Sequence, residues 1–239
     1  MLRPWWCSMI DRYIVAASTY AERIDHLVML IGVLVGFWFV LIEIIFLGLI
    51  VAFRERPGGR SEYITGEEKQ QMRWITIPHY LVLVCDVFII IGAVRVWYDI
   101  KQNLPPAEET VRVIAQQWAW SFVHAGPDGK LGTADDIATV DEMRLEVNKL
   151  YHYKLEARDV LHSFSVPVFR LKQDAIPGRI VTGWFQPTRT GTFDIQCVEI
   201  CGAGHALMPA RVVVESHAEH LAWMNSHAPV APLAAAEPR

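Results

Sequence analysis

The sequence predicts a two-helix transmembrane hairpin followed by an all-β domain. Before residue 100, residues 27–53 and 74–97 are nearly all apolar, and each is long enough to cross a hydrocarbon core of about 30 Å. After residue 110 the hydrophobic pattern changes to a period of two, which is typical of half-buried strands. A net charge of −4 lacks the basic character of nucleic-acid-binding proteins, so no nucleic-acid partner is expected.

The first 25 residues differ from the spans that follow. Residues 1–25 contain Trp5, Trp6 and scattered charges, without a clear small-residue cleavage site. This pattern argues against a cleavable signal peptide. We therefore expect a short interfacial segment over residues 1–25.

The hairpin is expected over residues 26–98, with spans at about 27–53 and 74–97. The loop between the spans is rich in basic residues, and the positive-inside rule places such a loop in the cytoplasm. Two spans then send the C-terminal domain to the opposite side. The basic residues are Arg54, Arg56, Arg60, Lys69 and Arg73.

Four ionisable residues lie inside the predicted spans: Glu43, His79, Asp86 and Arg95. Such side chains are costly in lipid and should face protein or water. His79 and Asp86 are seven residues apart and share a helix face. They form either a polar contact or proton path with a partner subunit, or a packing contact that only satisfies the side chain. Both readings indicate that the hairpin is not alone in lipid.

The β domain is expected over residues 111–217, after a linker at 99–110 that contains Pro105 and Pro106. Many short strands with turn signals indicate a sandwich or barrel. Residues 218–239 are expected to form a C-terminal tail, whose Ala- and Pro-rich end (228–239) should be disordered. The clearest strands lie near 142–148 and 151–155, with others at 111–124, 162–169, 179–186, 191–196 and 210–215.

The stretch from residue 196 to 209 reads Q-C-V-E-I-C-G-A-G-H-A-L-M-P and predicts a metal site. Thiolates, imidazole and thioether form a soft ligand set that suits copper, with zinc or an inert or redox thiol pair as alternatives. Two cysteines suggest two thiolates that bridge two metal ions, which requires a second histidine. His162, in D-V-L-H-S-F-S-V-P, is the candidate. The loop donors are Cys197, Cys201, His205 and Met208.

These two motifs, together with K-Q-D-A-I-P-G-R at residues 172–179, resemble subunit II of haem-copper cytochrome c oxidase. The resemblance covers both the membrane part and the soluble part. It implies a cupredoxin-like Greek-key barrel that holds a dinuclear copper A centre. The implied ligands are His162, Cys197, the backbone carbonyl of Glu199, Cys201, His205 and Met208.

The resemblance implies an electron-accepting subunit of an oxidoreductase and translocase. Cytochrome c would supply the electrons, and haem in the catalytic subunit I would receive them for reduction of oxygen to water. The chain has no oxygen site of its own and would act only within the complex, beside other subunits and membrane lipid. Trp118, in Q-W-A-W, would receive the electron and Trp120 would pack beside it, although an ordinary core tryptophan is the alternative for Trp118.

The resemblance also implies a magnesium or manganese ion at the boundary with the catalytic subunit. The side chain of Glu199 would bind it, and Asp174 and Arg179 would face the same boundary. Two positions depart from the family pattern. Gln71 stands where the family often has a glutamate at a proton-channel entrance, and Arg158 stands where an acid is common in the cytochrome c docking face.

Residues 126–136 read G-P-D-G-K-L-G-T-A-D-D and look like an insertion. Acids interleaved with glycines resemble short calcium loops, so Asp128, Asp135 and Asp136 are candidate calcium ligands. A hairpin loop with solvated acids is the alternative, because the EF-hand spacing is incomplete.

Two other functions remain open from the sequence. The chain could be the copper A domain of a nitrous oxide or nitric oxide reductase, or a membrane-anchored copper-delivery protein. The hairpin and the K-Q-D-A-I-P-G-R segment favour the oxidase. The inserted loop and the lack of a cleavable signal favour a bacterial inner (cell) membrane, with the copper domain on the periplasmic side.

Overall fold

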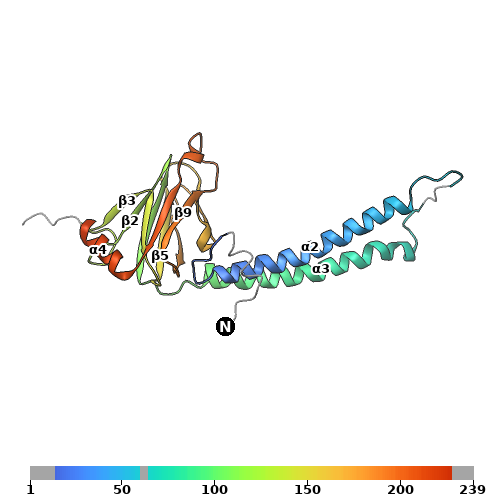
Figure 1. Ribbon diagram of the computed structural model, residues 1–239, viewed down its shortest axis with the longest axis horizontal. Coiled ribbons are helices and arrows are strands. Elements are labelled where there is room, and N and C mark those ends of the chain that lie inside the picture. The colour runs from blue at the N-terminus through green and yellow to red at the C-terminus, as the bar shows by residue number, and fades with distance from the viewer. Residues whose placement is uncertain (1–13, 60–63, 228–239) are drawn as a thin grey trace, which may run out of the picture. The chain divides into compact units, whose positions relative to one another are not determined.

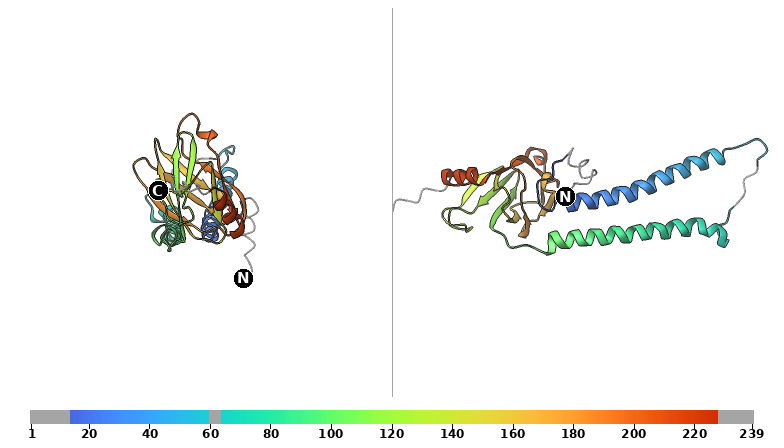
Figure 2. Two further views of the ribbon diagram at one scale, coloured as in Figure 1. Left: turned by 90° about the vertical axis from the view of Figure 1, so that its left-hand side faces the viewer. Right: turned by 60° about the horizontal axis from the view of Figure 1, so that its bottom comes forward.

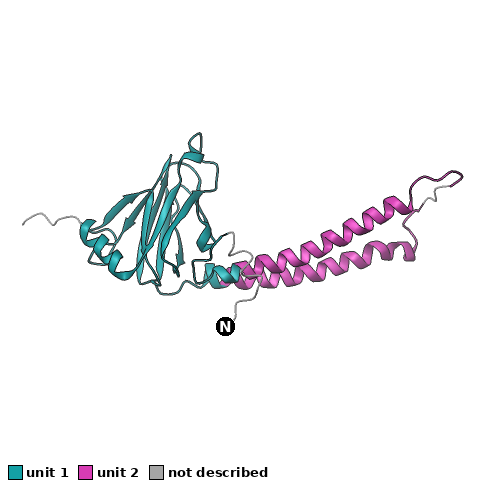
Figure 3. Ribbon diagram, viewed as in Figure 1, with its two compact units in different colours: residues 1–24, 99–239 teal, residues 25–98 magenta. Residues whose placement is uncertain are grey.

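A computed structural model describes residues 14–59 and 64–227. The chain divides into two compact units, which Figure 3 distinguishes by colour. The first comprises residues 1–24 and 99–239, and contains the β domain. The second comprises residues 25–98, and contains most of the helical hairpin.

The hairpin consists of α2 (Ala21–Ala52) and α3 (Lys69–Trp97), which continues as a π-helical turn, η1 (Tyr98–Gln102). The helices run in opposite directions and are joined by the basic loop (Figure 2). Both are long and apolar enough to cross a membrane, with mean hydropathies of 2.7 and 2.2. The π-helical turn occupies the first third of the expected linker, because the helical backbone continues past Trp97.

Polar side chains are present along the hairpin. Trp38 Nε1 donates to Cys85 Sγ at 3.4 Å, which ties α2 to α3. Glu43, His79, Asp86 and Arg95 are exposed on the isolated hairpin. In the described part of the chain, none of these four side chains forms an ion pair.

The β domain consists of two five-stranded sheets (Figure 1). One sheet has the order β3 (Ile137–Val140), β2 (Ala119–His124), β1 (Glu109–Gln116), β5 (Tyr151–Ala157), β8 (Val181–Phe185). The other has the order β4 (Glu142–Glu146), β10 (Ala210–Glu215), β9 (Gly191–Cys197), β6 (His162–Val166), β7 (Leu171–Ala175). β1 pairs with β5 and β4 pairs with β10 in parallel, whereas the other pairs are antiparallel. The predicted fold class is thereby confirmed.

An aromatic core joins the two sheets. Phe164 of β6 contacts the rings of Trp120 and Phe122 on β2 and Tyr153 on β5, at centroid distances of 5.4 to 6.4 Å. Tyr153 also stacks on Phe185 at 5.9 Å. Every residue of β6 is buried, so the strand lies inside the domain rather than at its surface.

Several strands differ from the expectation. Residues 111–124 form two strands, β1 and β2, because the chain reverses at Gln117 and Trp118. β3 and β7 were not predicted. β3 is only four residues long, and β7 carries three polar residues, so neither has a strong apolar alternation.

Residues 14–20 form an N-terminal strap on the β domain. Ala17 N donates to Val168 O at 2.8 Å, and Thr188 N donates to Ala17 O at 2.9 Å. Ser18 Oγ donates to Phe169 O at 3.0 Å, and Tyr20 is buried. These residues therefore pack against the β domain, whereas the sequence predicts an interfacial segment there. Residues 1–13, which carry Trp5 and Trp6, lie outside the described residues.

A helix, α4 (His217–His227), stands where the sequence analysis expects the start of a tail. Ser216 and Glu219 form a capping box at its beginning: Ser216 N donates to Glu219 Oε2 at 2.9 Å, and Glu219 N donates to Ser216 Oγ at 3.4 Å. Trp223 anchors the helix and is 6% exposed. The S-x-x-E signature was available in the sequence. The predicted disorder at 228–239 lies outside the described residues.

Candidate metal centre

Two adjacent strands bring the upstream histidine to the cysteine loop. His162 is the first residue of β6, and Cys197 is the last residue of β9. Phe164 is paired with Cys197, and Val198 N donates to Ser163 O at 3.0 Å. Because of this register, Cys197 Sγ lies 3.9 Å from His162 Nδ1.

The loop after β9 folds back so that its donors surround the two sulfur atoms. Cys197 Sγ lies 3.9 Å from Cys201 Sγ and 3.3 Å from the carbonyl oxygen of Glu199. Cys201 Sγ lies 3.6 Å from His205 Nδ1 and 3.4 Å from Met208 Sδ. Each thiol therefore has its own imidazole and one weaker donor. The structure brings all six predicted donors together.

The chemistry of this donor set fits copper. Both cysteines are free thiols, and the ligand atoms of His162, Cys197 and Cys201 lie within 4.8 Å of one another. Soft thiolates and a thioether favour copper over hard cations such as magnesium. Burial, reinforced by the neighbouring Cys197, raises the pKa of Cys201 to about 11. Copper binding must therefore displace a proton from this thiol at neutral pH.

Asp159 orients the buried histidine. Its Oδ1 atom lies 2.9 Å from His162 Nε2 and accepts from Val160 N, while Oδ2 accepts from Gln117 N at 2.6 Å. Partial burial raises the pKa of Asp159, but the hydrogen bonds from Gln117, His162 and Val160 lower it overall. The proton is thus held on Nε2, which leaves Nδ1 free to bind metal. The D-x-x-H spacing of Asp159 and His162 is the signal in the sequence that could have indicated this role.

We expect Asp159→Asn to weaken copper binding by about 10–100-fold, the usual effect of losing a partner that orients a metal-binding histidine. An amide cannot hold the imidazole tautomer as a carboxylate does. Competition with a copper chelator measures the affinity. Asp194→Asn is the matched control, because Asp194 is exposed on β9. Equal copper affinities in the two variants would contradict the orienting role.

Two further residues support the loop from β2 and the turn before it. Trp120 is fully buried, and its Nε1 atom donates to Met208 O at 3.2 Å. Its ring also meets His162 edge-on, with centroids 6.2 Å apart. Gln117 Nε2 donates to Cys201 O at 2.8 Å. Trp120 therefore fixes the loop as well as filling the core, and Gln117 was not anticipated.

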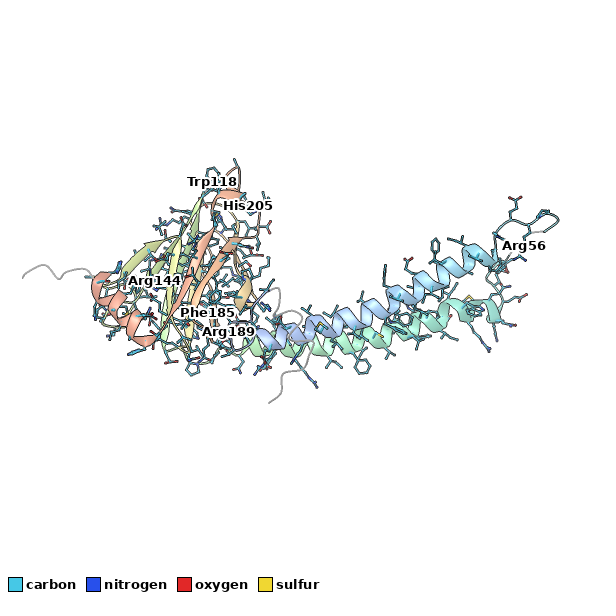
Figure 4. All side chains as sticks on the ribbon, in the orientation of Figure 1. Arg56, Trp118, Arg144, Phe185, Arg189 and His205 are labelled. Atoms are coloured by element: carbon cyan, nitrogen blue, oxygen red, sulfur yellow. The ribbon has the colours of Figure 1, made fainter. Side chains whose placement is uncertain are left out.

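Trp118 covers the loop from the solvent side. A Cβ atom on Gly204 would lie 2.4 Å from Trp118 Cδ2, and one on Gly202 would lie 2.8 Å from Gln117 Nε2. Only glycines allow the indole to approach the loop this closely. Trp118 is 42% exposed, which excludes the alternative of an ordinary core tryptophan. Figure 4 shows Trp118 and His205 close together at one end of the β domain.

The residues expected at the boundary with a catalytic subunit lie in different settings. Glu199 is half-buried, and its side chain forms no ion pair within the described residues. Asp174 accepts from Ser163 Oγ at 2.7 Å and pairs with Lys172 at 2.8 Å. Arg179 is exposed. A magnesium or manganese ion bound by Glu199 therefore stays a prediction.

The acidic loop at residues 126–136 uses its carboxylates internally. Asp128 Oδ1 accepts from Lys130 N, Asp135 Oδ2 from Asp128 N and Asp136 Oδ2 from Gly132 N, at 2.8 to 3.0 Å. Thr133 Oγ1 also donates to Asp135 Oδ1 at 2.6 Å. These contacts favour the alternative of a hairpin loop closed by its own acids over a calcium site.

The two residues that depart from the family pattern, Gln71 and Arg158, each form a hydrogen bond with a nearby residue. Gln71 Oε1 accepts from Gly66 N at 3.0 Å, so this side chain closes the loop before α3. Arg158 Nη1 donates to Gln116 Oε1 at 3.0 Å. Glu156 pairs with Arg112 at 2.6 Å, which reduces the free acidic charge near the centre.

Comparison with known proteins identifies the family. Residues 109–217 match the family model for the periplasmic domain of cytochrome c oxidase subunit II. The chain is 29% identical to the alternative cytochrome c oxidase subunit 2 of Bradyrhizobium diazoefficiens, over 94% of this chain and 85% of that protein. It is 31% identical to cytochrome c oxidase subunit 2 of Oncopeltus fasciatus, over 69% of this chain and 76% of that protein.

A solved structure also matches, the periplasmic domain of subunit II of cytochrome oxidase from Bradyrhizobium japonicum. It is 31% identical, covers 52% of this chain and 96% of that domain, and has a TM-score of 0.47. The family model, the relatives and the sequence motifs agree. The chain belongs to the cytochrome c oxidase subunit II family, and is a membrane-anchored subunit of a cytochrome c oxidase.

Proposed function

We propose that the chain receives electrons from a c-type cytochrome at a dinuclear copper A centre and delivers them to haem in the catalytic subunit, which reduces oxygen to water. The observation that carries this proposal is the pair of thiols 3.9 Å apart, each with its own histidine. A single metal ion would need only one such pair of thiol and imidazole, so two pairs favour two metal ions. The family membership favours the oxidase over a copper-delivery protein or another reductase.

The protein would hold the copper pair in a rigid, dry site. Cys197, Cys201, His162, His205, Met208 and the Glu199 carbonyl would hold the copper ions. When bound, the copper pair would supply a one-electron redox centre. Cys201 and Met208 are 3% and 1% exposed, so the chain itself excludes water from one side of the pair.

Electrons would enter through Trp118. Its exposed indole lies against Gly202 and Gly204 of the ligand loop, and offers a flat π-face to a docking partner. Ile200 and Leu207, beside the ligands, are 76% and 80% exposed. The surface of the ligand loop is therefore largely apolar, and a donor would make contact there rather than with free acids.

We further propose that the subunit lies in a bacterial inner membrane, with the copper domain on the periplasmic side. The positive-inside rule supports this orientation, because Arg54, Arg56 and Arg60 lie in the loop between α2 and α3, and Lys69 and Arg73 lie in the first turns of α3. The exposed ionisable residues of the hairpin would face the catalytic subunit rather than lipid. The magnesium or manganese ion at Glu199 would belong to the same boundary.

The purified oxidase tests this function through its copper content and its electron paramagnetic resonance spectrum. We expect two copper ions for each chain, and hyperfine splitting from two equivalent nuclei that share one unpaired electron. Reduced cytochrome c should abolish the signal rapidly. A single copper ion, or zinc, at this centre would exclude the dinuclear assignment.

A variant separates the electron path from the metal site. Trp118→Leu should keep the copper spectrum, because the indole is not a ligand, but should slow the reduction of copper by cytochrome c. A normal reduction rate in this variant would exclude Trp118 as the point where electrons enter, and would leave the copper assignment intact.

A further inference from the structure

A buried histidine outside the metal centre lies beneath the C-terminal helix. His124 is the last residue of β2 and is 1% exposed, and neither ring nitrogen has a hydrogen-bond partner in the described part of the chain. Its ring meets Trp223 of α4 edge-on at 5.2 Å. The neighbouring strands β1 and β3 place Val111 and Ile137 opposite it. This environment accepts a neutral imidazole and penalises an imidazolium ion.

The charged groups around His124 do not compensate a positive charge. From β4, Arg144 lies over Trp223 at 5.8 Å and pairs with Glu142 and with Glu215 of β10. From α4, His220 faces the same Glu215, at 3.3 Å. Both carboxylates are therefore already engaged, and the remaining neighbours are an imidazole and a guanidinium. Burial, reinforced by His220 and Arg144, lowers the pKa of His124 to about 3.

The attachment of α4 depends on this same cluster. The helix has 11 residues, of which His220 and Trp223 are buried. His227 lies on the other side of Trp223 along the helix, with ring centroids 5.4 Å apart. Figure 4 shows Arg144 on the side of the domain where α4 lies. In the described part of the chain α4 lies outside both sheets, so the helix can leave the domain without breaking a sheet, and its departure would expose His124 to water.

We propose that α4 is a latch that acid releases: protonation of His124 undocks α4 from the end of the domain where β2, β4 and β10 meet. The docked state keeps the imidazole neutral down to pH about 3, whereas the undocked state titrates at the ordinary value of 6.5. The undocked state therefore binds more protons between these values. The docking equilibrium constant falls about tenfold for each pH unit below 6.5, until pH about 3.

Amide hydrogen exchange of the intact purified oxidase tests the latch. Protection factors, corrected for intrinsic exchange, are measured for α4 and for strands β1 and β5 at pH 7.5, 6.0 and 4.5. We expect the protection of α4 to fall about 100-fold between pH 7.5 and 4.5, while the strands keep theirs. Unchanged protection of α4 would overturn the latch, and so would a parallel loss in the strands, which reports global unfolding.

Two variants connect the effect to His124. His124→Phe keeps an aromatic edge against Trp223 but cannot titrate, so the protection of α4 should no longer depend on pH. His124→Leu repeats this test with an aliphatic side chain if the larger ring prevents folding. His217→Ala removes a second contact between α4 and β4, with Glu146, and the pH dependence due to His124 should persist in this variant. A pH dependence that persists without His124 would overturn the proposal.

Discussion

Replacing Cys201 by serine is expected to abolish the copper centre and to reduce cytochrome c oxidation by more than about 100-fold. The thiol lies within 3.9 Å of Cys197 Sγ, His205 Nδ1 and Met208 Sδ, so it is the atom that joins the two halves of the site. A serine hydroxyl is a hard, weakly acidic ligand that suits copper poorly. Loss of a residue that only orients a metal ligand usually costs about 10–100-fold, and loss of a direct ligand should cost more.

Copper content, the resonance spectrum and the rate of cytochrome c oxidation measure this effect. Cys85→Ser is the matched control, because that thiol lies in α3 and contacts Trp38 rather than the centre. The control should keep both copper ions. A Cys201→Ser oxidase that still shows a signal shared between two coppers would refute the bridging role.

Truncation of Trp120 is expected to destabilise the β domain more than any change at its surface. The side chain is fully buried between the sheets, and such truncations usually cost about 3–5 kcal/mol. The variant Trp120→Ala also removes the donor to Met208 O. The thermal midpoint of the copper domain should therefore fall by about 10 °C or more.

Trp118→Ala provides the comparison, since that indole is 42% exposed and leaves no comparable cavity. Its thermal midpoint should change far less, although both variants remove a tryptophan next to the ligand loop. Calorimetry of the purified oxidase measures both midpoints. Equal shifts would mean that Trp120 does not hold the two sheets together.

The parts of the fold that could be predicted follow strong periodic signals. The two spans and the strands around Met143, Tyr151 and Tyr153 alternate or persist over many residues, so burial dictates their structure. β3 and β7 could not be predicted, because pairing with neighbouring strands, rather than their own hydrophobic pattern, makes them strands. Helix α4 was not predicted because its apolar face consists of little more than Trp223, although the capping box at Ser216 marks its beginning.

The candidate site shows the same division. Its donors are concentrated in one loop, so the motif alone could indicate them, and only His162 had to come from elsewhere. Of the supporting contacts, only that of Asp159 is marked in the sequence, by its D-x-x-H spacing to His162. Gln117 and Trp120 reach the ligand loop because the turn between β1 and β2 lies beside it. That placement depends on the sheet order, on which sequence spacing contains no information.

The N-terminal strap has a consequence for the order in which the chain matures. Ser18 donates to the carbonyl of Phe169, a partner 151 residues further along the chain. Residues 14–20 are synthesised long before β6 and the 3-10 turn η2 (Pro167–Phe169), against which they pack. The strap therefore cannot reach its place until the chain has been made at least as far as Phe169, and its closure is a late step in the folding of the domain.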